Sequence, residues 1–412
     1  MELVINSNGG KKIVNLELTT GGVNLANTLN NMKNKSKIYD YCKQRAGTYY
    51  WLPKGLKVMS AIEDWLNSEL SKMGAVNFET PHLISSELLS KERIFADHFE
   101  NECFRVGLKH YLKPTAELLI YDYMQKKIKS YKQLPLLVFQ KSVTFRREVN
   151  CTPFIRAAQI AHFHETHGFY KNPTDALQGI EAAKRIYTAL FKMLRIPCIV
   201  VKRPKNDTFP GADFTIAYDT IICGRRLQIG TIHYLATNYH GISKLMYRDK
   251  NGLQKPVYQI CYGISERILL AQYYFNSYGD FWHIPDEINR ELVISDCDKS
   301  KTMAILGQHG IPQYANKIRY IDKYTSKALE DFRIKNLGYL GYKYAIITRA
   351  NGNSEIIKLF NSSKIDILPK INFKSENGNK PAYSKELKKI NLDGQNVLYG
   401  HDGTHTYWGP SH

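Results

Sequence analysis

Acidic residues are scarce in this sequence relative to basic ones, and no membrane-length apolar run is present. The 412 residues contain 57 Lys and Arg against 38 Asp and Glu, which gives a formal net charge of +19. No stretch approaches the roughly 20 apolar residues that a membrane span needs. The N-terminal MELVINSNGGKK also lacks the apolar segment of a signal peptide. We therefore expect a cytoplasmic protein without a membrane segment, with an organelle as the alternative location. Its positive field favours a polyanionic partner.

Paired cysteines are also absent. The seven cysteines are odd in number and widely scattered, and none forms a Cys-x-x-Cys pair. This pattern is typical of reduced thiols in a cytosol-like compartment, and it argues against a zinc site built from cysteines. Three histidines near the end of the chain, His401, His405 and His412, are irregularly spaced and fit a solvated tail better than a metal site.

Composition and periodicity divide the chain into four segments. Residues 1–46 are polar and predict a short strand-bearing extension followed by a mobile connector. In residues 47–290, helical patterns are interspersed with many strand-like runs, which indicates an antiparallel sheet in an α+β domain. Residues 291–368 alternate strand, helix and strand and predict a small α/β unit. Residues 369–412 form a tail.

Three helices are expected in the α+β domain. The first ends near Gly74 and places one apolar stripe along its length, made of Leu56, Met59, Ile62, Trp65, Leu66, Leu70 and Met73. VNFETPHLI follows as a strand, in which Pro81 marks an edge or an interface. The second helix opens at Thr115, and the third is bounded by Pro173 and Pro197.

The stretch TFRREVNCTPFIRAAQIAHFHETHGFY, residues 144–170, carries much charge for two half-buried strands. Because residues two apart share one face of a strand, Arg146 and Glu148 are expected to point the same way. Phe163, Glu165 and His167 are expected to share a face of the second strand. A solvated surface with ordinary ion pairs is the alternative, but the interleaved aromatic residues favour a binding site.

Two further segments suggest a bound anion or ligand. In GRRLQIGTIHYL, residues 224–235, Gly230 is expected to let a ligand approach the backbone. In CYGISERILLAQYY, Arg267 lies in the first turn of a predicted helix, where a cation is unfavourable unless an anion binds there. Two purely structural alternatives stay open. His233 could be a hydrogen-bonded strand histidine, and Arg267 could form a surface ion pair.

These segments together resemble the class II aminoacyl-tRNA synthetases. PHLI with Pro81, FRRE at 145–148 and GISER at 263–267 are similar to motifs 1, 2 and 3 of that class. YLKPTAELLIYDYMQKKI, TPFIR and GTIHYL resemble the prolyl branch of class IIa, whereas GISERILLAQYYFNSYGDFWHIP looks closer to threonyl enzymes. The similarity covers roughly residues 45–290. It implies a six- or seven-stranded antiparallel sheet flanked by helices, a homodimer formed through the motif 1 region, and an anticodon-binding-like domain at about 291–368.

The resemblance also implies an activity and a site. The protein would activate proline or a similar small amino acid with ATP and Mg²⁺ and transfer it to tRNA. Arg146 would hold the α-phosphate of ATP and Arg267 the distal phosphates, which neutralises the charge that develops in adenylate formation. The other implied ATP contacts are Glu148 and Phe154 at the adenine, with Gln228 and Thr231 nearby. The implied amino-acid contacts are Thr115, Glu117, Phe163, Glu165, His167 and His233.

Departures from the family pattern leave alternatives open. Threonyl enzymes hold zinc with one Cys and two His, but here Thr115 lies near the Cys position and Tyr258 at the second His position, so only His167 remains. This argues against threonine and against zinc. Thr115 and Glu117 also fit an ordinary helix start. Two other functions are open: a stand-alone enzyme that adenylates an amino acid for another acceptor, and a non-catalytic nucleic-acid-binding paralogue.

Transfer RNA would be held mainly by basic residues outside the ATP site. The expected contacts are Arg319, Lys323, Lys385, Lys388 and Lys389. Because such phosphate contacts release counterions, tRNA binding is expected to fall steeply with salt. A solvated charge run is the alternative for the tail lysines.

Overall fold

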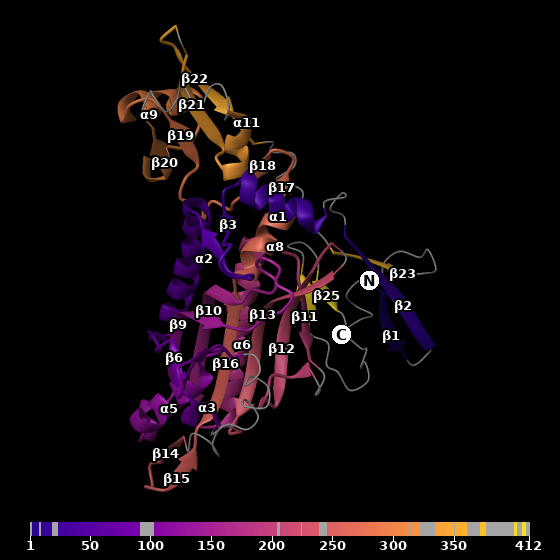
Figure 1. The fold of residues 1–412 in the computed structure, drawn as a ribbon, viewed down its shortest axis with the longest axis vertical. Coiled ribbons are helices and arrows are strands. Elements are labelled where there is room, and N and C mark those ends of the chain that lie inside the picture. The colour runs from indigo at the N-terminus through magenta and orange to yellow at the C-terminus, as the bar shows by residue number, and fades with distance from the viewer. Residues whose placement is uncertain are drawn as a thin grey trace.

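A seven-stranded sheet forms the centre of the molecule (Figure 1). In spatial order its strands are β11 (Ile199–Lys202), β12 (Phe214–Ile222), β13 (Arg225–Ala236), β16 (Tyr258–Ser265), β10 (Gln159–Tyr170), β9 (Leu136–Phe145) and β5 (Val76–Asn77). Every neighbouring pair is antiparallel except β5 and β9, which are parallel. The predicted α+β class with an antiparallel sheet is confirmed.

The computed structural model describes most of the chain. Described are residues 2–7, 10–18, 24–90, 103–203, 207–223, 225–238, 245–313, 315–321, 334–349, 351–360, 371–375, 399–401 and 406–408. Several predicted tRNA contacts and tail histidines lie outside these ranges, namely Lys323, Lys385, Lys388, Lys389, His405 and His412. The side chain of His401 is also outside the described part. Within the described residues, no helix combines the length and apolarity needed to cross a bilayer.

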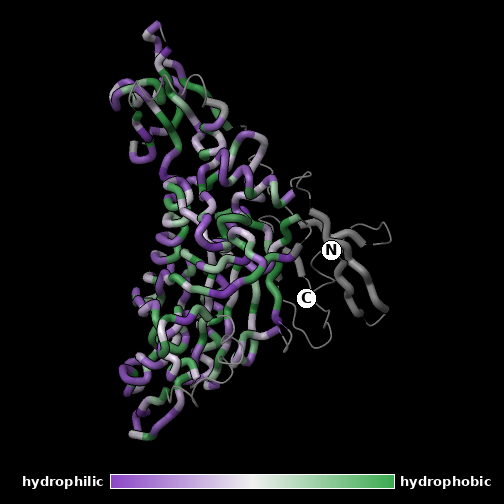
Figure 2. The backbone as a smooth tube through the Cα atoms, in the orientation of Figure 1, coloured by the Kyte–Doolittle hydropathy of each residue, from purple (hydrophilic) through white to green (hydrophobic). Residues whose placement is uncertain are grey.

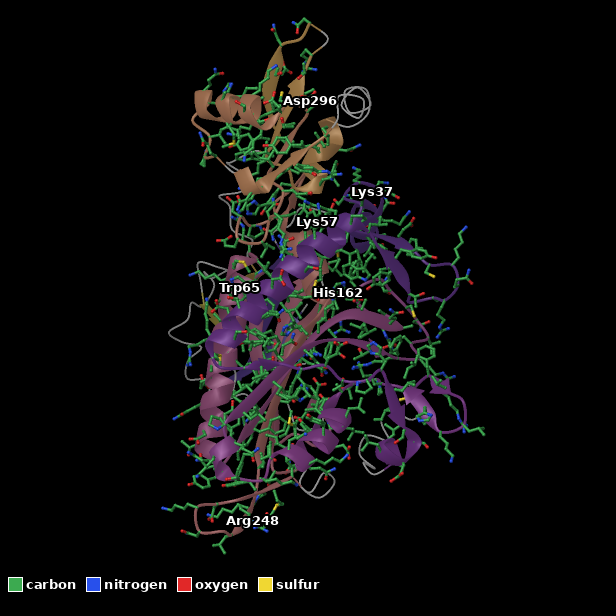
Figure 3. The ribbon with its side chains drawn as sticks, turned by 90° about the vertical axis from the view of Figure 1, so that its left-hand side faces the viewer. Lys37, Lys57, Trp65, His162, Arg248 and Asp296 are labelled. Carbon is green, nitrogen blue, oxygen red and sulfur yellow. The ribbon has the colours of Figure 1, made fainter. Side chains whose placement is uncertain are left out.

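Helices cover one face of the sheet. α6 (Pro173–Met193) begins at Asn172, whose side chain accepts a hydrogen bond from the Asp175 N–H, and it packs Tyr187 and Phe191 against the rings of β12 and β16. α2 (Pro53–Lys72) and α8 (Arg267–Asn276) join the same hydrophobic core. Figure 3 shows α2 crossing the strands, with Trp65 and Lys57 along it. In Figure 2 the hydrophobic colour follows the strands of this sheet.

The opposite face of the sheet is only partly covered. α5 (Glu117–Lys127) lies there, and the ring of Tyr121 packs edge-on against His167 and Phe169 of β10. Residues of β10 at even positions, such as His162, instead face α2, where the ring hydrogen-bonds the Glu63 carboxylate at 2.7 Å. The uncovered part of this second face therefore remains available to a ligand.

A smaller sheet follows the central domain. Its order is β20 (Ile318–Tyr320), β19 (Val293–Ser295), β21 (Tyr344–Thr348) and β22 (Ser354–Lys358), with α9 (Lys299–Gln308) after β19. β19 is parallel to both of its neighbours, as strand–helix–strand connections require. The Tyr342 hydroxyl donates to Glu291, and Glu291 also binds Lys57 of α2, so this sheet is joined to the central domain by polar contacts.

Further short strands and α-helices lie in the described part of the chain. They are β1 (Glu2–Ser7), β2 (Gly10–Leu18), α1 (Leu25–Asn34), β3 (Tyr39–Tyr41), β4 (Tyr49–Trp51), β6 (Leu83–Ser85), α3 (Ser86–Ser90), β7 (Arg105–Val106), β8 (His110–Leu112), β14 (Met246–Arg248), β15 (Gln254–Pro256), β17 (Ser277–Tyr278), β18 (Phe281–Trp282), α11 (Ile334–Leu337), β23 (Ile371–Ser375), β24 (Tyr399–His401) and β25 (Thr406–Trp408). β23 pairs with β2, so segments near both ends of the chain share one sheet.

Four details of the sequence prediction are wrong. The predicted connector contains the helix α1, because Leu29 and Met32 are buried in the main core and Asn24 caps the helix. Leu56 is 40% exposed and lies off the buried stripe of α2. VNFETPHLI forms two short strands in different sheets, β5 and β6, on either side of Pro81. The second helix starts at Glu117 and not at Thr115.

Candidate active site

A cavity of about 550 Å³ opens on the uncovered face of the central sheet. Strands β10, β13 and β16 form its floor, and the start of α5, the start of α8 and residues 207–210 line its sides. Of the predicted site residues, those that line it are Thr115, Glu117, Arg146, Phe163, Glu165, His167, Gln228, Thr231, His233 and Arg267. Residues from widely separated segments therefore converge on one cavity.

Strand alternation explains much of this convergence. Phe163, Glu165 and His167 lie on one face of β10, as predicted. Arg146 and Glu148 follow the end of β9 at Phe145, so the expected shared strand face does not exist for them.

A bulge in β13 places Gln228 at the cavity. The pairing of β12 with β13 shifts between Tyr218 and Asp219, so that Tyr218 opposes Gly230 and Asp219 opposes Gln228. Without this shift Gln228 and Thr231, three apart, would face opposite sides. The bulge brings both into the lining.

Gly230 lines the cavity, and its missing side chain also serves the packing on the helix-covered face of the sheet. A Cβ on Gly230 would lie 3.3–3.4 Å from Ile264, Phe191 and Tyr187, so the missing side chain makes room for α6. Gly263 of β16 also lines the cavity. Its Cβ would lie 3.1 Å from the Phe163 ring, a residue of the cavity lining.

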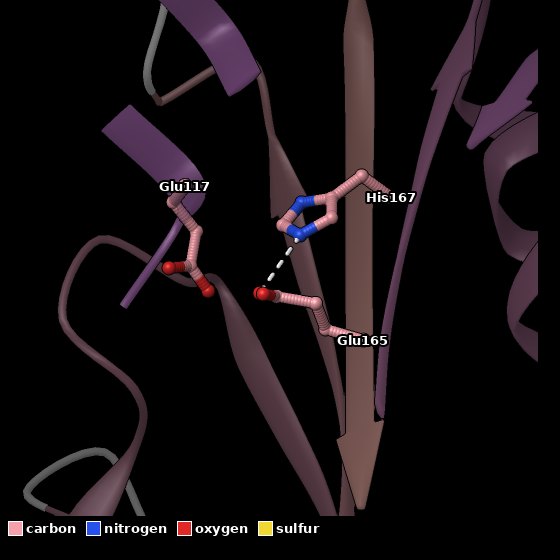
Figure 4. Close-up of side chains that lie close together, drawn as sticks. All are labelled: Glu117, Glu165 and His167. Atoms are coloured by element: carbon pink, nitrogen blue, oxygen red, sulfur yellow. Dashed lines mark hydrogen bonds and ion pairs between the residues drawn. The ribbon is translucent and has the colours of Figure 1, made fainter. Parts of the chain in front are cut away.

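Acidic groups gather at one end of the cavity. The ligand atoms of Glu117, Glu165 and His167 all lie within 4.8 Å of one another, and all three residues are buried (Figure 4). His167 Nε2 is 3.3 Å from Glu165 Oε2. Burial, and next the neighbouring Glu165 charge, raise the pKa of the Glu117 carboxyl. Two carboxylates and an imidazole form a donor set for a cation, either an ammonium group or a metal ion.

Thr115 belongs to this acidic end and does not cap the helix. The N-cap of α5 is Ala116, which has no side-chain acceptor. The Thr115 hydroxyl instead donates to the Glu117 carboxylate. The interpretation of Thr115 as an ordinary helix start is therefore wrong.

His233 is both hydrogen-bonded and part of the lining. Its Nδ1 is 2.8 Å from the Thr215 hydroxyl, and the Phe209 ring lies against it with centroids 4.5 Å apart. Burial, with a smaller effect of His167, lowers the pKa of His233 to about 3. The imidazole is therefore neutral at physiological pH and contributes an aromatic, uncharged wall.

Two arginines, Arg146 and Arg267, line the cavity near the start of β10. Arg146 follows Phe145, which pairs with Gln159, and Arg267 comes two residues after Ser265, which pairs with Phe163. Arg267 Nη2 and Nε donate to the Ile155 carbonyl at 2.7 and 3.1 Å, and Nη1 donates to the Gln228 carbonyl at 3.3 Å. Burial, and next the positive charge of Arg146, lower the pKa of Arg267 to about 10. The alternative of a surface ion pair for Arg267 is wrong, because its guanidinium donates to backbone carbonyls. Two cations that line one cavity favour a bound anion.

Two predicted adenine contacts do not line the cavity. Glu148 Oε2 accepts hydrogen bonds from Arg156 Nε and Nη2 at 3.0 and 2.7 Å. Phe154 is only 1% exposed, and its ring packs edge-on against Tyr39 and Trp51. Their roles at the adenine stay predictions, and in this structure both side chains already have protein partners.

Sequence reasoning missed a set of supporting residues. Arg203 Nη2 donates to Asp219 at 2.7 Å and to the Gln228 side chain at 3.1 Å, which orients the glutamine. Gln140 of β9 donates to Glu165 at 2.8 Å. These residues belong to no recognisable motif. The only available signal was the alternation of polar residues in QKSVT, residues 140–144.

Comparison with known protein families gives one match. Residues 104–274 match the family model described as the tRNA synthetase class II core domain (G, H, P, S and T). This range contains all of the lining residues named above. It ends before the smaller sheet, whose strand β19 begins at Val293.

Known proteins with similar sequences are named proline–tRNA ligases. A proline–tRNA ligase of Methanopyrus kandleri is 38% identical over 235 residues, which cover 55% of this chain and 48% of that protein. A proline–tRNA ligase of Methanococcus maripaludis is 36% identical over 247 residues, covering 58% and 54%. The chain thus matches about half the length of these relatives.

Solved structures show the same fold. The Giardia lamblia prolyl-tRNA synthetase in complex with prolyl-adenylate has a TM-score of 0.70 at 23% identity, covering 84% of this chain and 77% of that one. The Cryptosporidium parvum prolyl-tRNA synthetase complexed with L-proline and AMP has a TM-score of 0.63 at 19% identity, covering 79% and 70%.

Proposed function

We propose that the protein activates proline as an aminoacyl-adenylate and transfers it to tRNA, because residues 104–274 match the model of the class II tRNA synthetase core domain. The observation that carries the proposal is the division of charge in one cavity. A pair of arginines lies near the start of β10, and a buried carboxylate pair lies around Glu165, farther along that strand. Adenylate formation needs such an arrangement, because it joins an anionic phosphate to an amino acid whose ammonium group is cationic.

The basic end would hold the nucleotide. When bound, ATP with Mg²⁺ would supply the adenylyl group that activates the carboxylate, with pyrophosphate as the leaving group. Arg146 would bind the α-phosphate and Arg267 the distal phosphates, so that charge is neutralised where it develops. Arg267 suits this role because its donors to Ile155 and Gln228 fix the guanidinium before ligand binding. Gln228 is itself held by Arg203 and would lie over the nucleotide with Thr231.

The acidic end would hold the amino acid. Glu117 and Glu165 would bind its ammonium group, with Thr115 beside them. Phe163, Phe209 and the neutral His233 line the cavity and offer rings to a small apolar side chain. Proline is proposed over other small amino acids because the relatives named above are proline–tRNA ligases.

The acceptor and assembly belong to the same proposal. The sheet of β19–β22 fits the predicted anticodon-binding-like domain at 291–368, with 1–46 as an extension and 369–412 as a tail. The homodimer would form through the segment around Pro81, where Val76 and Leu83 are 56% and 44% exposed. Arg319 of β20 would contact tRNA together with the tail lysines.

Transfer to tRNA is tested by aminoacylation. The full chain is incubated with ATP, Mg²⁺, labelled proline and total tRNA, and acid-precipitable label is measured. The expected result is proline-dependent charging that falls steeply as salt rises. Proline activation without tRNA charging would favour a stand-alone enzyme with another acceptor. Nucleic-acid binding without ATP binding would favour a non-catalytic paralogue.

A further inference from the structure

A buried lysine that the proposed chemistry does not use lies behind the acidic end of the cavity. Lys113, between β8 and α5, is 1% exposed. Its Nζ donates to the Thr80 hydroxyl at 2.8 Å and lies 3.4 Å from the Thr80 carbonyl. Its own N–H donates to the His82 carbonyl, and its carbonyl accepts from the Phe145 N–H. Lys113, which lies just before α5, is therefore hydrogen-bonded to the segment around Pro81 and to the end of β9.

A chain of hydrogen bonds runs from Lys113 to the cavity. Gln140 Oε1 accepts from the Thr80 N–H at 2.9 Å and lies 3.2 Å from the Thr80 hydroxyl. Gln140 Nε2 donates to Glu165 Oε1 at 2.8 Å. Thr80 and Gln140 are 4% and 1% exposed, so no solvent competes for these groups. Glu165 is the last residue of this hydrogen-bond series, and it lines the cavity.

The chemistry of Lys113 fixes which group donates and which accepts in each of these hydrogen bonds. An ammonium group only donates, so the Thr80 oxygen accepts from Lys113 and the Thr80 proton is directed to Gln140 Oε1. The Thr80 N–H also requires the carbonyl oxygen of Gln140 on that side. The amide nitrogen of Gln140 must then face Glu165, where it can only donate. Each bond therefore determines the next one.

We propose that Lys113, acting through Thr80 and Gln140, is a positioning residue that holds the Glu165 carboxylate where it meets the ammonium group of the substrate. This inference rests on the proposed function, because it names the support of the same amino-acid site. Burying an ammonium group is costly unless it is hydrogen-bonded and paired. The positive charge of Lys113 stands behind the acidic end, where it offsets part of the negative charge of the carboxylate pair.

The test compares Lys113→Met, Thr80→Val and Gln140→Leu in amino-acid-dependent ATP–pyrophosphate exchange. Each change removes the polar group of one member of this hydrogen-bond series while keeping a similar side-chain volume. The expected result is a KM for proline raised about 10- to 100-fold, the range for losing a hydrogen bond to a charged group, with the KM for ATP within about twofold of the parent. Thr80→Ser keeps the hydroxyl and should restore the parent KM. Lys126→Met, which removes an exposed lysine paired with Asp122, is the matched control.

A double-mutant cycle separates positioning from general destabilisation. Because the residues act in series, Lys113→Met combined with Gln140→Leu should raise the KM for proline no further than the larger single change. Additive effects, an unchanged KM for proline, or equal losses for proline and ATP would overturn the proposal.

A second measurement does not depend on activity. Removing the acceptor of the Thr80 N–H in Gln140→Leu should accelerate hydrogen–deuterium exchange in the segment around Thr80, and unchanged exchange there would contradict the network. If the parent protein activates no amino acid but this acceleration is seen, the proposed function fails while the hydrogen-bond chain stands. If the parent activates proline and neither readout moves, only the positioning proposal fails.

Discussion

At the scale of single residues, the two arginines of the cavity should be essential and an exposed arginine should not. Arg146→Ala and Arg267→Met remove groups proposed to neutralise developing phosphate charge, so each should lower proline-dependent pyrophosphate exchange by about 10²- to 10³-fold. The control is Arg290→Met, because that guanidinium is exposed and pairs with Asp64 away from the cavity. A parent-like rate in either cavity variant, or an equal loss in the control, would contradict the assignment.

The carboxylate pair should bind an amine and not a metal ion. Glu117, Glu165 and His167 could hold zinc by their donor types. If the substrate ammonium occupies this place, a zinc-selective chelator should leave exchange unchanged in excess Mg²⁺. Added Zn²⁺ should inhibit in competition with proline. Loss of exchange with the chelator, restored by Zn²⁺, would instead make the cluster a metal site.

Sequence reasoning located the groups that meet the cavity better than those that support them. Glu165 and His167 could be placed together because strand alternation fixes their face. Gln140 could not be linked to Glu165, because the pairing of β9 with β10 depends on the loop of residues 146–158 between them. Phe154 was expected at the adenine, but its burial against Tyr39 and Trp51 depends on β3 and β4, which the sequence did not predict.

At the scale of helices and strands, the errors arise where tertiary contacts override local preference. Asn- and Lys-rich residues made α1 look like a connector, yet Leu29 and Met32 are buried against the main core and stabilise it. The bulge at Ile229 could not be read from GRRLQIGTIHYL, because it exists only in the pairing with β12. The boundaries of α6 were predictable, since Asn172 and Pro173 form its start locally.

The first turn of α2 contains a lysine that should lower the stability of the protein. Lys54 is buried beside Lys57 and Arg319, with Glu291 as the nearby acid, and burial lowers its pKa to about 8. A cation at a helix N-terminus is also unfavourable. Lys54→Met should therefore raise the free energy of unfolding at pH 7 by about 1–3 kcal/mol.

The pH dependence checks the cause of this effect. Between the folded pKa near 8 and the unfolded pKa of 10.5, the unfolded parent binds more protons, so its stability rises with pH. The advantage of Lys54→Met should shrink across this window in denaturant titrations. Lys72→Met, at an exposed lysine of the same helix, should change little. A less stable Lys54→Met protein at pH 7 would show that the contact with the Tyr342 ring outweighs the burial cost.

At the scale of the whole molecule, the order of strands and the meeting of the chain ends were beyond sequence analysis. The strand-like runs of residues 47–290 predicted an antiparallel sheet, and the sheet that contains β9, β10, β12, β13 and β16 is observed. The pairing of β2 with β23 joins residues more than 350 positions apart, as in Leu18 with Ile371 and Val14 with Ser375. No local pattern specifies such a pairing, because register is set by partners distant in sequence.

The protein should lose stability in mild acid. Burial lowers the pKa of His164 to about 4, of His233 to about 3 and of His283 to about 4. Below pH 6.5 the unfolded chain binds protons at these positions and the folded chain does not, so the free energy of unfolding falls as pH drops toward 4. Each histidine should contribute about 1–2 kcal/mol between pH 7 and pH 5. Denaturant titrations at both values check this, and His164→Phe should show a smaller loss than the parent.

Amino-acid-dependent ATP–pyrophosphate exchange is the most direct measurement of the central claim, that the cavity joins an amino acid to ATP. The full chain is assayed with each of the twenty amino acids in the absence of tRNA. We expect exchange with proline well above that with the other nineteen, and its loss in Arg146→Ala. Exchange with a different amino acid would contradict the substrate, and absence of exchange with all twenty would contradict the activity itself.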